Sequence, residues 1–221
     1  MNKFRVLSGG LAVVALLALA GCTPTAPVSS PSPTASDSAT PTPTPTPTPT
    51  QVTASSIVIS GSAITVLGGS AVIATIPYST DGATASGQLT TALGAGPALS
   101  VVAEASCTRA GTNYDWGGFQ LVGSGDATRA PGSIFTVTAS STVASPGVSI
   151  VGPGGVHVGT TEADLMAALP SATFTDDGFG NNLYNLESTG GSGPDATGVL
   201  GIVTGGALIK IVSPVYISGD C

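Results

Sequence analysis

The sequence predicts an α+β fold that is mostly antiparallel β-sheet with two short helices. Beyond Gln51, apolar residues alternate with polar ones or form short runs interrupted by glycine, a pattern typical of β-strands. Two other segments carry apolar residues at the spacing of an amphipathic helix. This part of the chain has about 170 residues, enough to bury a hydrophobic core without a structural metal.

A series of segments is expected to form strands. The glycine pairs Gly68-Gly69 and Gly205-Gly206 each separate two such segments and therefore predict hairpin turns. Pro214 is expected to interrupt the ladder because it lacks an N–H donor, which leaves a short last edge strand. The expected strands are 56–60, 63–67, 71–76, 98–103, 118–122, 134–139, 183–186, 199–204, 207–212 and 215–217.

The first helix is expected at 83–93. Gly94 follows it and supplies a C-terminal stop, because glycine readily adopts the left-handed conformation that ends many helices. The residues on its apolar face are Ala85, Leu89, Ala92 and Leu93.

The second helix is expected at 162–169. Thr161, with Asp164 three residues later, resembles a capping box in which Asp replaces Glu, and Pro170 ends the helix. Because both helices are short, packing on a sheet should stabilise them more than helix propensity does.

The two expected helices have similar surroundings. Each follows a strand and a polar cap, and each precedes a strand, a polar turn and a strand with aromatic residues, at 116–122 and 183–186. The chain beyond Gln51 is therefore either one unrepeated domain, 52–221, or two diverged helix-plus-sheet repeats, 52–140 and 141–221, in one compact body. Repeats would make it similar in outline to the tandem helix-plus-sheet repeats of secreted β-lactamase inhibitor proteins, an analogy of architecture alone.

Residues 1–21 have the order of an export signal. Lys3 and Arg5 precede an apolar run, 11–20, which is shorter than the roughly 20 residues needed to span a bilayer. The run ends in Leu19-Ala20-Gly21-Cys22, which resembles the lipobox of bacterial lipoproteins. This resemblance implies cleavage after Gly21 and a diacylglycerol on the thiol of Cys22. The alternative is an ordinary secretory peptide in which Cys22 is incidental.

Residues 22–51 are expected to form a disordered tether. They contain nine prolines, and Thr and Pro alternate strictly over 40–50. Proline fixes φ and removes a donor, so neither helix nor sheet is favoured there. The threonines could also carry O-linked sugars. In composition, the Thr-Pro tether and the Lys-poor, Ala-rich remainder resemble exported lipoproteins of high-GC Gram-positive bacteria.

The charge of the chain excludes nucleic acid as a ligand. Without residues 1–21, only three basic residues face twelve acidic ones, so the formal charge is 3 − 12 = −9. Nucleic-acid binding needs Lys and Arg to displace counterions from phosphate. The basic residues are Arg109, Arg129 and Lys210, too few for a patch that would bind anionic lipid headgroups.

Cys107 and Cys221 form an even pair once Cys22 is assigned to lipid. In an oxidising compartment such a pair predicts a disulfide, which would join the middle of the domain to the end of the chain. The alternatives are two free thiols, or a metal site made of both cysteines and His157. Such a site lacks a fourth ligand and the usual spacing of metal ligands.

Catalytic and metal motifs are not evident. His157, the only histidine, is expected on a strand. The sequence contains no Gly-x-Ser-x-Gly nucleophile elbow whose serine a catalytic histidine could activate. The segment 176–182 is rich in oxygen ligands but lacks the spacing of a calcium loop, and a glycine-rich hairpin turn explains it more simply. Glu162 and Asp164 are explained by their place in the first helical turn rather than as a glycosidase pair.

Three of the few aromatic residues, Tyr114, Trp116 and Phe119, lie close together and next to Gly117-Gly118. Flanking glycines can leave aromatic rings accessible to a sugar or peptide ligand. The single Trp of an aromatic-poor domain usually belongs to the core, so we expect these residues in the core and hold ligand contact as the weaker alternative.

Together these features favour a non-catalytic protein of the cell envelope. We expect it to be attached to the membrane through lipid on Cys22, on the extracytoplasmic face, and to bind an envelope protein or a wall glycan. We expect no cofactor and no metal. The alternative is a small-ligand carrier, or an envelope enzyme whose site is assembled from residues scattered in the sequence.

Overall fold

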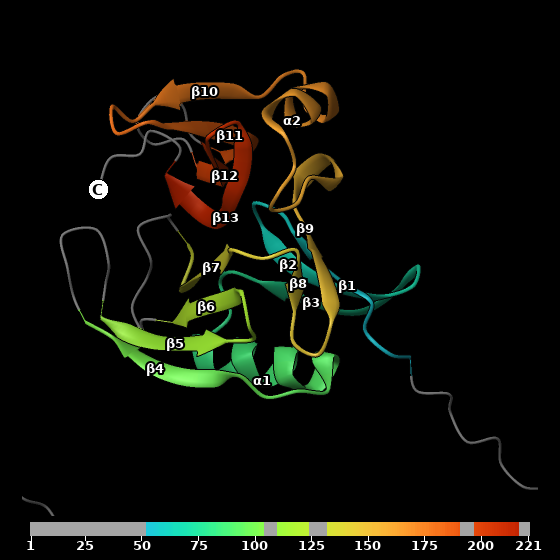
Figure 1. Ribbon diagram of the computed structural model, residues 1–221. Coiled ribbons are helices and arrows are strands. Elements are labelled where there is room, and N and C mark those ends of the chain that lie inside the picture. Colours follow the sequence, from blue (N-terminus) through green and yellow to red (C-terminus); the bar gives the residue numbers. More distant parts are fainter. Residues whose placement is uncertain (1–51, 104–109, 124–131, 191–196, 217–221) are drawn as a thin grey trace, which may run out of the picture. The chain divides into compact units, whose positions relative to one another are not determined.

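Two β-sheets and two α-helices make up the described part of the chain (Figure 1). The computed structural model describes residues 52–103, 110–123, 132–190 and 197–216, all of which belong to one compact unit, 48–221. Strands predominate, and all but one of the pairings between neighbouring strands are antiparallel. The predicted fold class, α+β with mostly antiparallel sheet and two helices, is confirmed.

The smaller sheet has five strands in the order β3-β2-β1-β9-β8, so that β3 and β8 are its edges. Its single parallel pairing joins β1 to β9, which brings together segments that are far apart in the sequence. The strands are β1 (Ser56–Ile59), β2 (Ala63–Gly68), β3 (Ala71–Pro77), β8 (Val143–Ala144) and β9 (Val148–Val151).

The larger sheet has eight strands in the order β10-β11-β12-β13-β7-β6-β5-β4, and every pairing in it is antiparallel. The strands are β4 (Ala98–Val102), β5 (Gly111–Asp115), β6 (Phe119–Gly123), β7 (Phe135–Ala139), β10 (Thr173–Asp176), β11 (Asn181–Gly190), β12 (Thr197–Thr204) and β13 (Ala207–Tyr216).

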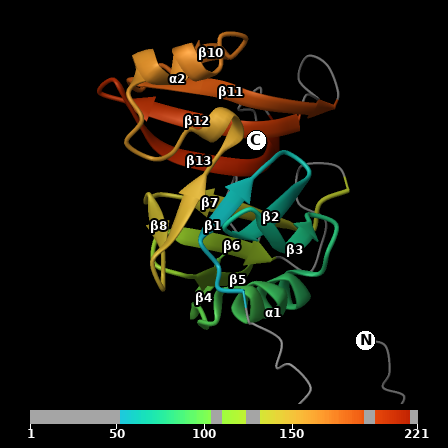
Figure 2. The same cartoon turned by 90° about the vertical axis from the view of Figure 1, so that its right-hand side faces the viewer.

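The order of the larger sheet is symmetric about its middle. Helix α1 (Gly82–Leu93) precedes the four strands β4–β7, and helix α2 (Glu162–Ala168) precedes the four strands β10–β13. The last strands of the two groups, β7 and β13, pair with each other at the centre. Figure 2 shows the two groups one above the other, with α2 beside the upper group and α1 beside the lower. Each half of the sheet thus has the same order of elements.

Both helices begin and end at residues suited to those positions. The Asp81 carboxylate accepts hydrogen bonds from the N–H groups of Ala83 and Thr84, both at 3.0 Å, and satisfies two donors of the first turn of α1. Gly94 ends α1 in the left-handed conformation, as predicted. At α2, Thr161 Oγ1 accepts from Asp164 N–H at 3.1 Å, which confirms the predicted cap.

The core lies between the two sheets, and both helices contribute side chains to it. Strands β1, β2, β6 and β7 alternate between buried and partly buried residues, as expected of strands that pack on one face. One continuous cluster joins the two sheets and both helices, so the two halves share one core. Its fully buried members include Ile57, Ile59, Ile64, Val66, Leu89, Phe119, Leu121, Phe135, Val137, Leu165 and Ile211.

The predicted hairpins are confirmed at both glycine pairs. Strands β2 and β3 are joined through Gly69, and β12 and β13 through Gly205 and Gly206, with φ angles of 64°, 62° and 79°. Positive φ at these positions matches the twist of the strands that flank a tight hairpin turn. The glycine-rich segment 176–182 likewise connects β10 to β11, as the hairpin interpretation required.

Two local expectations are wrong. His157 does not lie on a strand: it follows a short 3-10 helix (η1, Pro153–Gly155), and the positive φ of Gly154, Gly155 and Gly159 is incompatible with an extended strand. Pro214 does not end the last strand, because β13 continues to Tyr216. The register with β12 shifts opposite Pro214, so its missing N–H leaves no gap in a regular ladder.

Candidate functional site

The cysteines singled out by the sequence lie outside the described residues. Cys22 belongs to 1–51, Cys107 to 104–109 and Cys221 to 217–221. The predicted lipid attachment at Cys22 and the predicted disulfide between Cys107 and Cys221 therefore stay predictions.

The aromatic residues near Gly117-Gly118 belong to the core rather than to an exposed platform. Trp116 is 1% exposed and Phe119 is 0% exposed, and the Trp116 indole N–H donates to the carbonyl of Ala95 at 2.9 Å. Tyr114 is half-buried and packs against the same cluster. The core interpretation replaces the ligand-contact interpretation at Trp116 and Phe119, because neither ring offers a surface to a ligand.

The glycines beside Trp116 form the turn between β5 and β6. The Asp115 carboxylate accepts the N–H groups of Gly117 and Gly118, at 2.7 and 3.2 Å. Burial opposes ionisation of Asp115, but the bonds from the Gln120 amide and from the two N–H groups outweigh it and lower its pKa. A Cβ at Gly118 would lie 2.5 Å from that of Ser141, so this glycine is required by packing.

The acidic groups near α2 are engaged within the chain. Glu162 Oε1 accepts the Tyr184 hydroxyl at 2.6 Å and the Asn182 amide at 2.7 Å, and these bonds lower the pKa of Glu162. Burial and the contact with Glu162 raise the pKa of Tyr184 to about 12. The Asp177 carboxylate accepts from Asn181 and from the backbone of the β10–β11 turn. These groups stabilise local structure, as the sequence indicated for Glu162.

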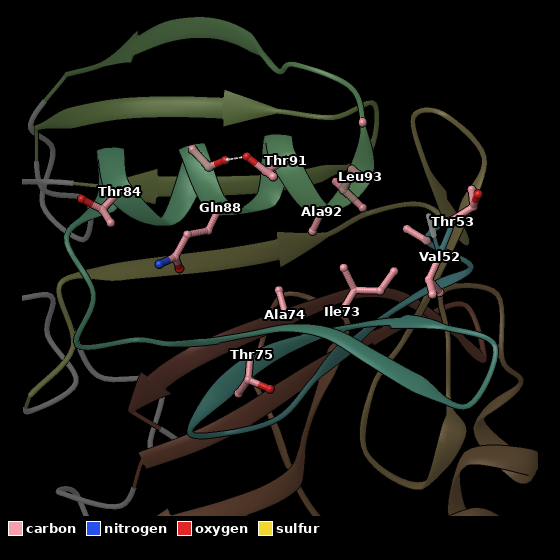
Figure 3. A pocket seen from close by; sticks show the side chains of 13 residues that line it. Val52, Thr53, Ile73, Ala74, Thr75, Thr84, Gln88, Thr91, Ala92 and Leu93 are labelled. Carbon is pink, nitrogen blue, oxygen red and sulfur yellow. Dashed lines mark hydrogen bonds between the residues drawn. The ribbon is translucent and has the colours of Figure 1, made fainter. Parts of the chain in front are cut away.

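In the part of the chain that the structure describes, a groove lies between α1 and the edge strand β3 of the smaller sheet. It has a volume of about 770 Å³ and runs along β3 (Figure 3). Val52, Thr53 and Ala54 close one end of it. The remaining lining residues are Ile73, Ala74 and Thr75 of β3, and Thr84, Gly87, Gln88, Thr91, Ala92, Leu93 and Gly94 of α1 and its end.

Helix α1 presents two different faces. One face is buried against β2, β3 and β6 and includes Ala85, Leu89 and Leu93. The other face, with Thr84, Gly87, Gln88 and Thr91 at helical spacing, lines the groove. The predicted apolar face of α1 is thus confirmed at those three buried positions, whereas Ala92 is only partly buried and borders the groove.

Gly87 keeps the middle of this groove open. A Cβ at Gly87 would meet no atom within 4 Å, so packing does not require glycine here. Glycine inside a helix costs about 1 kcal/mol relative to alanine. In Figure 3, Gln88 extends from the next position into the groove toward β3, whose Ile73 and Ala74 point back toward the helix. The helix therefore faces the groove with small or uncharged groups.

The free edge of β3 directs backbone polar groups toward the groove. Tyr78, just after β3, donates its N–H to the carbonyl of Ser62. Because bonding alternates along the ladder, Ile76 and Ala74 are the residues of β3 that bond to β2. The N–H and C=O of Thr75, and the C=O of Pro77, consequently point away from β2. Because β3 is the edge of its sheet, the described strands leave these groups without a ladder partner.

The position of α1 beside this edge depends on a close backbone contact. Cβ atoms built at Gly82 and Gly123 would each lie under 3 Å from the Cα of the other residue, at 2.7 and 2.9 Å. Only glycine at both positions lets the start of α1 approach β6 so closely. This contact fixes how closely the start of α1 approaches the larger sheet.

The groove is not predictable from the sequence. Its elements were predicted, but nothing in a single sequence says that β3 is an edge strand or that α1 lies beside it. Two signals were present: a glycine inside the first helix at Gly87, and Pro77 at the end of a strand, where proline favours an edge. The lining residues are all uncharged, so charge patterning gave no further signal.

No protein-family model, curated protein or solved structure matches this chain. Among the described residues, no helix is long and apolar enough to cross a membrane. Within the same residues, no three His, Cys, Asp or Glu side chains gather in a way that could hold a metal ion. The groove is therefore the feature of this structure from which a function can be inferred.

Proposed function

We propose that this protein is a membrane-anchored, non-catalytic binding protein of the cell envelope, and that its ligand occupies the groove between α1 and β3. Residues 1–22 supply the anchor through a lipobox-like sequence, and 22–51 supply a tether that holds the domain away from the membrane. The ligand is an envelope protein or a wall glycan. The groove is the observation that carries this proposal.

The chemistry of the groove supports binding rather than catalysis. Its thirteen lining residues are Val, Thr, Ala, Ile, Gly, Gln and Leu, none of which titrates near neutral pH. General acid–base catalysis needs a side chain that gains or loses a proton in that range. Hydrogen bonds from Gln88, the threonines and the β3 backbone, together with apolar contacts, are what such a lining provides.

The volume of the groove also suits a small molecule. At about 770 Å³ it falls within the range of pockets that bury small ligands. A small-ligand carrier is therefore the second candidate function, and it uses the same residues.

Photocrosslinking in living cells tests the proposal. A benzophenone amino acid at Gln88, inside the groove, is compared with the same group at Ala83, an exposed α1 residue that does not line it. We expect position 88 alone to give a discrete product that mass spectrometry identifies as an envelope protein or glycan, and Gly87→Leu to abolish it. Equal products from both positions, or none from position 88, would contradict the proposal. A small molecule retained in native mass spectra would favour the carrier.

The anchor is tested on the same purified protein. Its mass should correspond to a chain that begins at Cys22 and carries diacylglycerol, and Cys22→Ala should abolish membrane attachment. A wild-type product that begins at another residue, without lipid, would show that the lipobox resemblance is misleading.

A further inference from the structure

We infer that the groove binds an uncharged, extended polypeptide segment, which adds to the smaller sheet as a new strand beside β3. This inference rests on the proposed function, because it concerns the same groove, and it names the chemical class of the ligand. It commits to polypeptide rather than glycan as the occupant.

The first argument is the backbone of β3. Thr75, which lines the groove, directs both N–H and C=O away from β2, and Pro77, beyond the lining residues, directs its C=O the same way. Thr75 thus offers a donor and an acceptor, and Pro77 two residues later offers a second acceptor, which is the spacing at which another polypeptide strand presents its own N–H and C=O groups. Strand addition of this kind obtains affinity from main-chain bonds and specificity from alternate side chains. Glycan hydroxyls have no such fixed period.

The second argument is the placement of α1. Edge strands that are exposed and straight tend to pair with other chains without selection. Here α1 runs beside the edge, so an added strand must fit between β3 and the helix (Figure 3). The groove-facing stripe from Thr84 to Thr91 covers about 10 Å of helix, which corresponds to about three residues of a strand. Two alternate side chains of the segment would therefore face α1.

The third argument is the lining at those two places. Gly87 leaves open space in the middle of the stripe, where a side chain of the bound segment can be accommodated. Thr91 Oγ1 already donates to the carbonyl of Gly87 at 2.9 Å, whereas Gln88 extends toward β3 and can bond the segment. No lining residue carries a charge to pair with Lys, Arg, Asp or Glu. Burying an unpaired charge is costly, so uncharged segments are selected.

The length of the segment follows from the strand. Strand β3 has seven residues, and its outward groups extend from its middle to Pro77. A segment of about five or six residues covers that edge, which is the usual length of a strand in a sheet. Pro77 limits the pairing at one end, because it can accept a hydrogen bond but cannot donate one.

A peptide display experiment tests the inference without an identified ligand. A displayed library of random nonapeptides is selected on the full mature protein, and binders that also bind Gly87→Leu are removed. We expect uncharged sequences to be enriched. In a chosen peptide, N-methylation should weaken binding about tenfold at residues two apart and less than twofold at the residue between them, because only alternate N–H groups face β3.

Variants of Thr75 test the same point from the side of the protein. Thr75→Pro removes the outward N–H and should weaken binding of the chosen peptide between about threefold and tenfold, whereas Thr75→Val keeps the N–H and should change it less than twofold. If Thr75→Pro fails to fold, the N-methyl series decides alone. A library that yields no groove-dependent binder, or an N-methyl series without the two-residue period, would overturn strand addition.

The two proposals fail separately. A glycan or small molecule crosslinked at Gln88 in cells, together with a negative peptide selection, leaves the groove as a binding site but removes the polypeptide as its ligand. The absence of any crosslink specific to Gln88 removes the proposed function. If no such crosslink forms but N-methylation still weakens peptide binding at every second residue, the result shows only that the edge of β3 can accept a strand.

Discussion

Helix α1, which precedes β4–β7, has five buried residues of its own. Helix α2, which precedes β10–β13, has one, Leu165. Both helices precede four antiparallel strands, and the last strands of the two groups pair at the centre. The order of elements is the same. The helices nevertheless differ in length, in what fixes them to the sheet and in what lies beside them.

The difference arises from the neighbours of each helix. Helix α1 contacts β2 and β3 of the smaller sheet as well as β6, through apolar side chains and the contact between Gly82 and Gly123. Helix α2 contacts β13 and is linked to β11 by the hydrogen bonds of Glu162. Among the described residues, α1 contacts the edge strand β3, whereas α2 contacts the inner strand β13. One arrangement of strands produces a groove in one half and a closed polar contact in the other.

The largest expected change in the free energy of unfolding comes from replacing a buried aromatic residue in one half, compared with an exposed one in the other. Phe119 in β6 is 0% exposed, whereas Phe174 in β10 is 55% exposed and stacks on Tyr184 with ring centroids 5.3 Å apart. Phe119→Ala should lower the free energy of unfolding by about 3–5 kcal/mol because it leaves a cavity in the shared core. Phe174→Ala should lower it by about 1 kcal/mol. Urea unfolding of both variants measures the difference, and similar losses would contradict the assignment of Phe119 to the core.

Much of the fold could be predicted from the sequence. The strand at 71–76, the helix at 83–93 and both glycine hairpins follow from local patterns that do not depend on distant residues. The strand β5 was missed because its sequence, Gly-Thr-Asn-Tyr-Asp, is polar and lacks alternation. It is a strand because β4 and β6 pair with it on both sides. Local propensity carries no information of that kind.

The groove could not be predicted, for the same reason. It exists because β3 is an edge and because α1 is held close to β6 by two glycines that are 41 positions apart, at 82 and 123. Trp116 shows the converse: its glycine neighbours allowed an exposed ring as the weaker alternative, but they form the turn next to a ring that lies in the core, as expected. A glycine signals unusual backbone geometry or close packing, and only the fold tells which.

A smaller change, stabilising rather than destabilising, is expected from replacing Gly87. Helix α2 contains no glycine that corresponds to it. Gly87→Ala should raise the free energy of unfolding by about 1 kcal/mol, because alanine favours the helix and its Cβ would meet no neighbouring atom. Thermal unfolding of the variant checks this. A destabilised Gly87→Ala would show that the space beside Gly87 is filled, and it would argue against an open groove.

The smallest expected effect is a loss of stability of α2 at low pH. It depends on the hydrogen bonds that link Glu162 of α2 to Tyr184 and Asn182 of β11. The pKa of Glu162 is lowered by its bonds to Tyr184 and Asn182, so its folded-state pKa lies below that of the unfolded chain. The stabilisation by Glu162 is therefore fully present above its usual pKa of about 4.3 and is lost as the pH falls through the lowered value. Helix α1 has no such group on its buried face. Acid should consequently loosen α2 before α1.

Hydrogen exchange of the two helices, measured between pH 7 and pH 3 and corrected for the intrinsic effect of pH, tests this expectation. Protection of α2 should fall relative to α1 as the pH drops. Glu162→Gln should weaken that dependence, because glutamine can still accept the two hydrogen bonds but does not titrate. Tyr184→Phe, which removes one donor to Glu162, should weaken it in the same direction, because the carboxyl then titrates nearer its usual pKa. If α1 and α2 lose protection together in the wild type, the polar contact does not fix α2, and the contrast between the two halves lies in the groove alone.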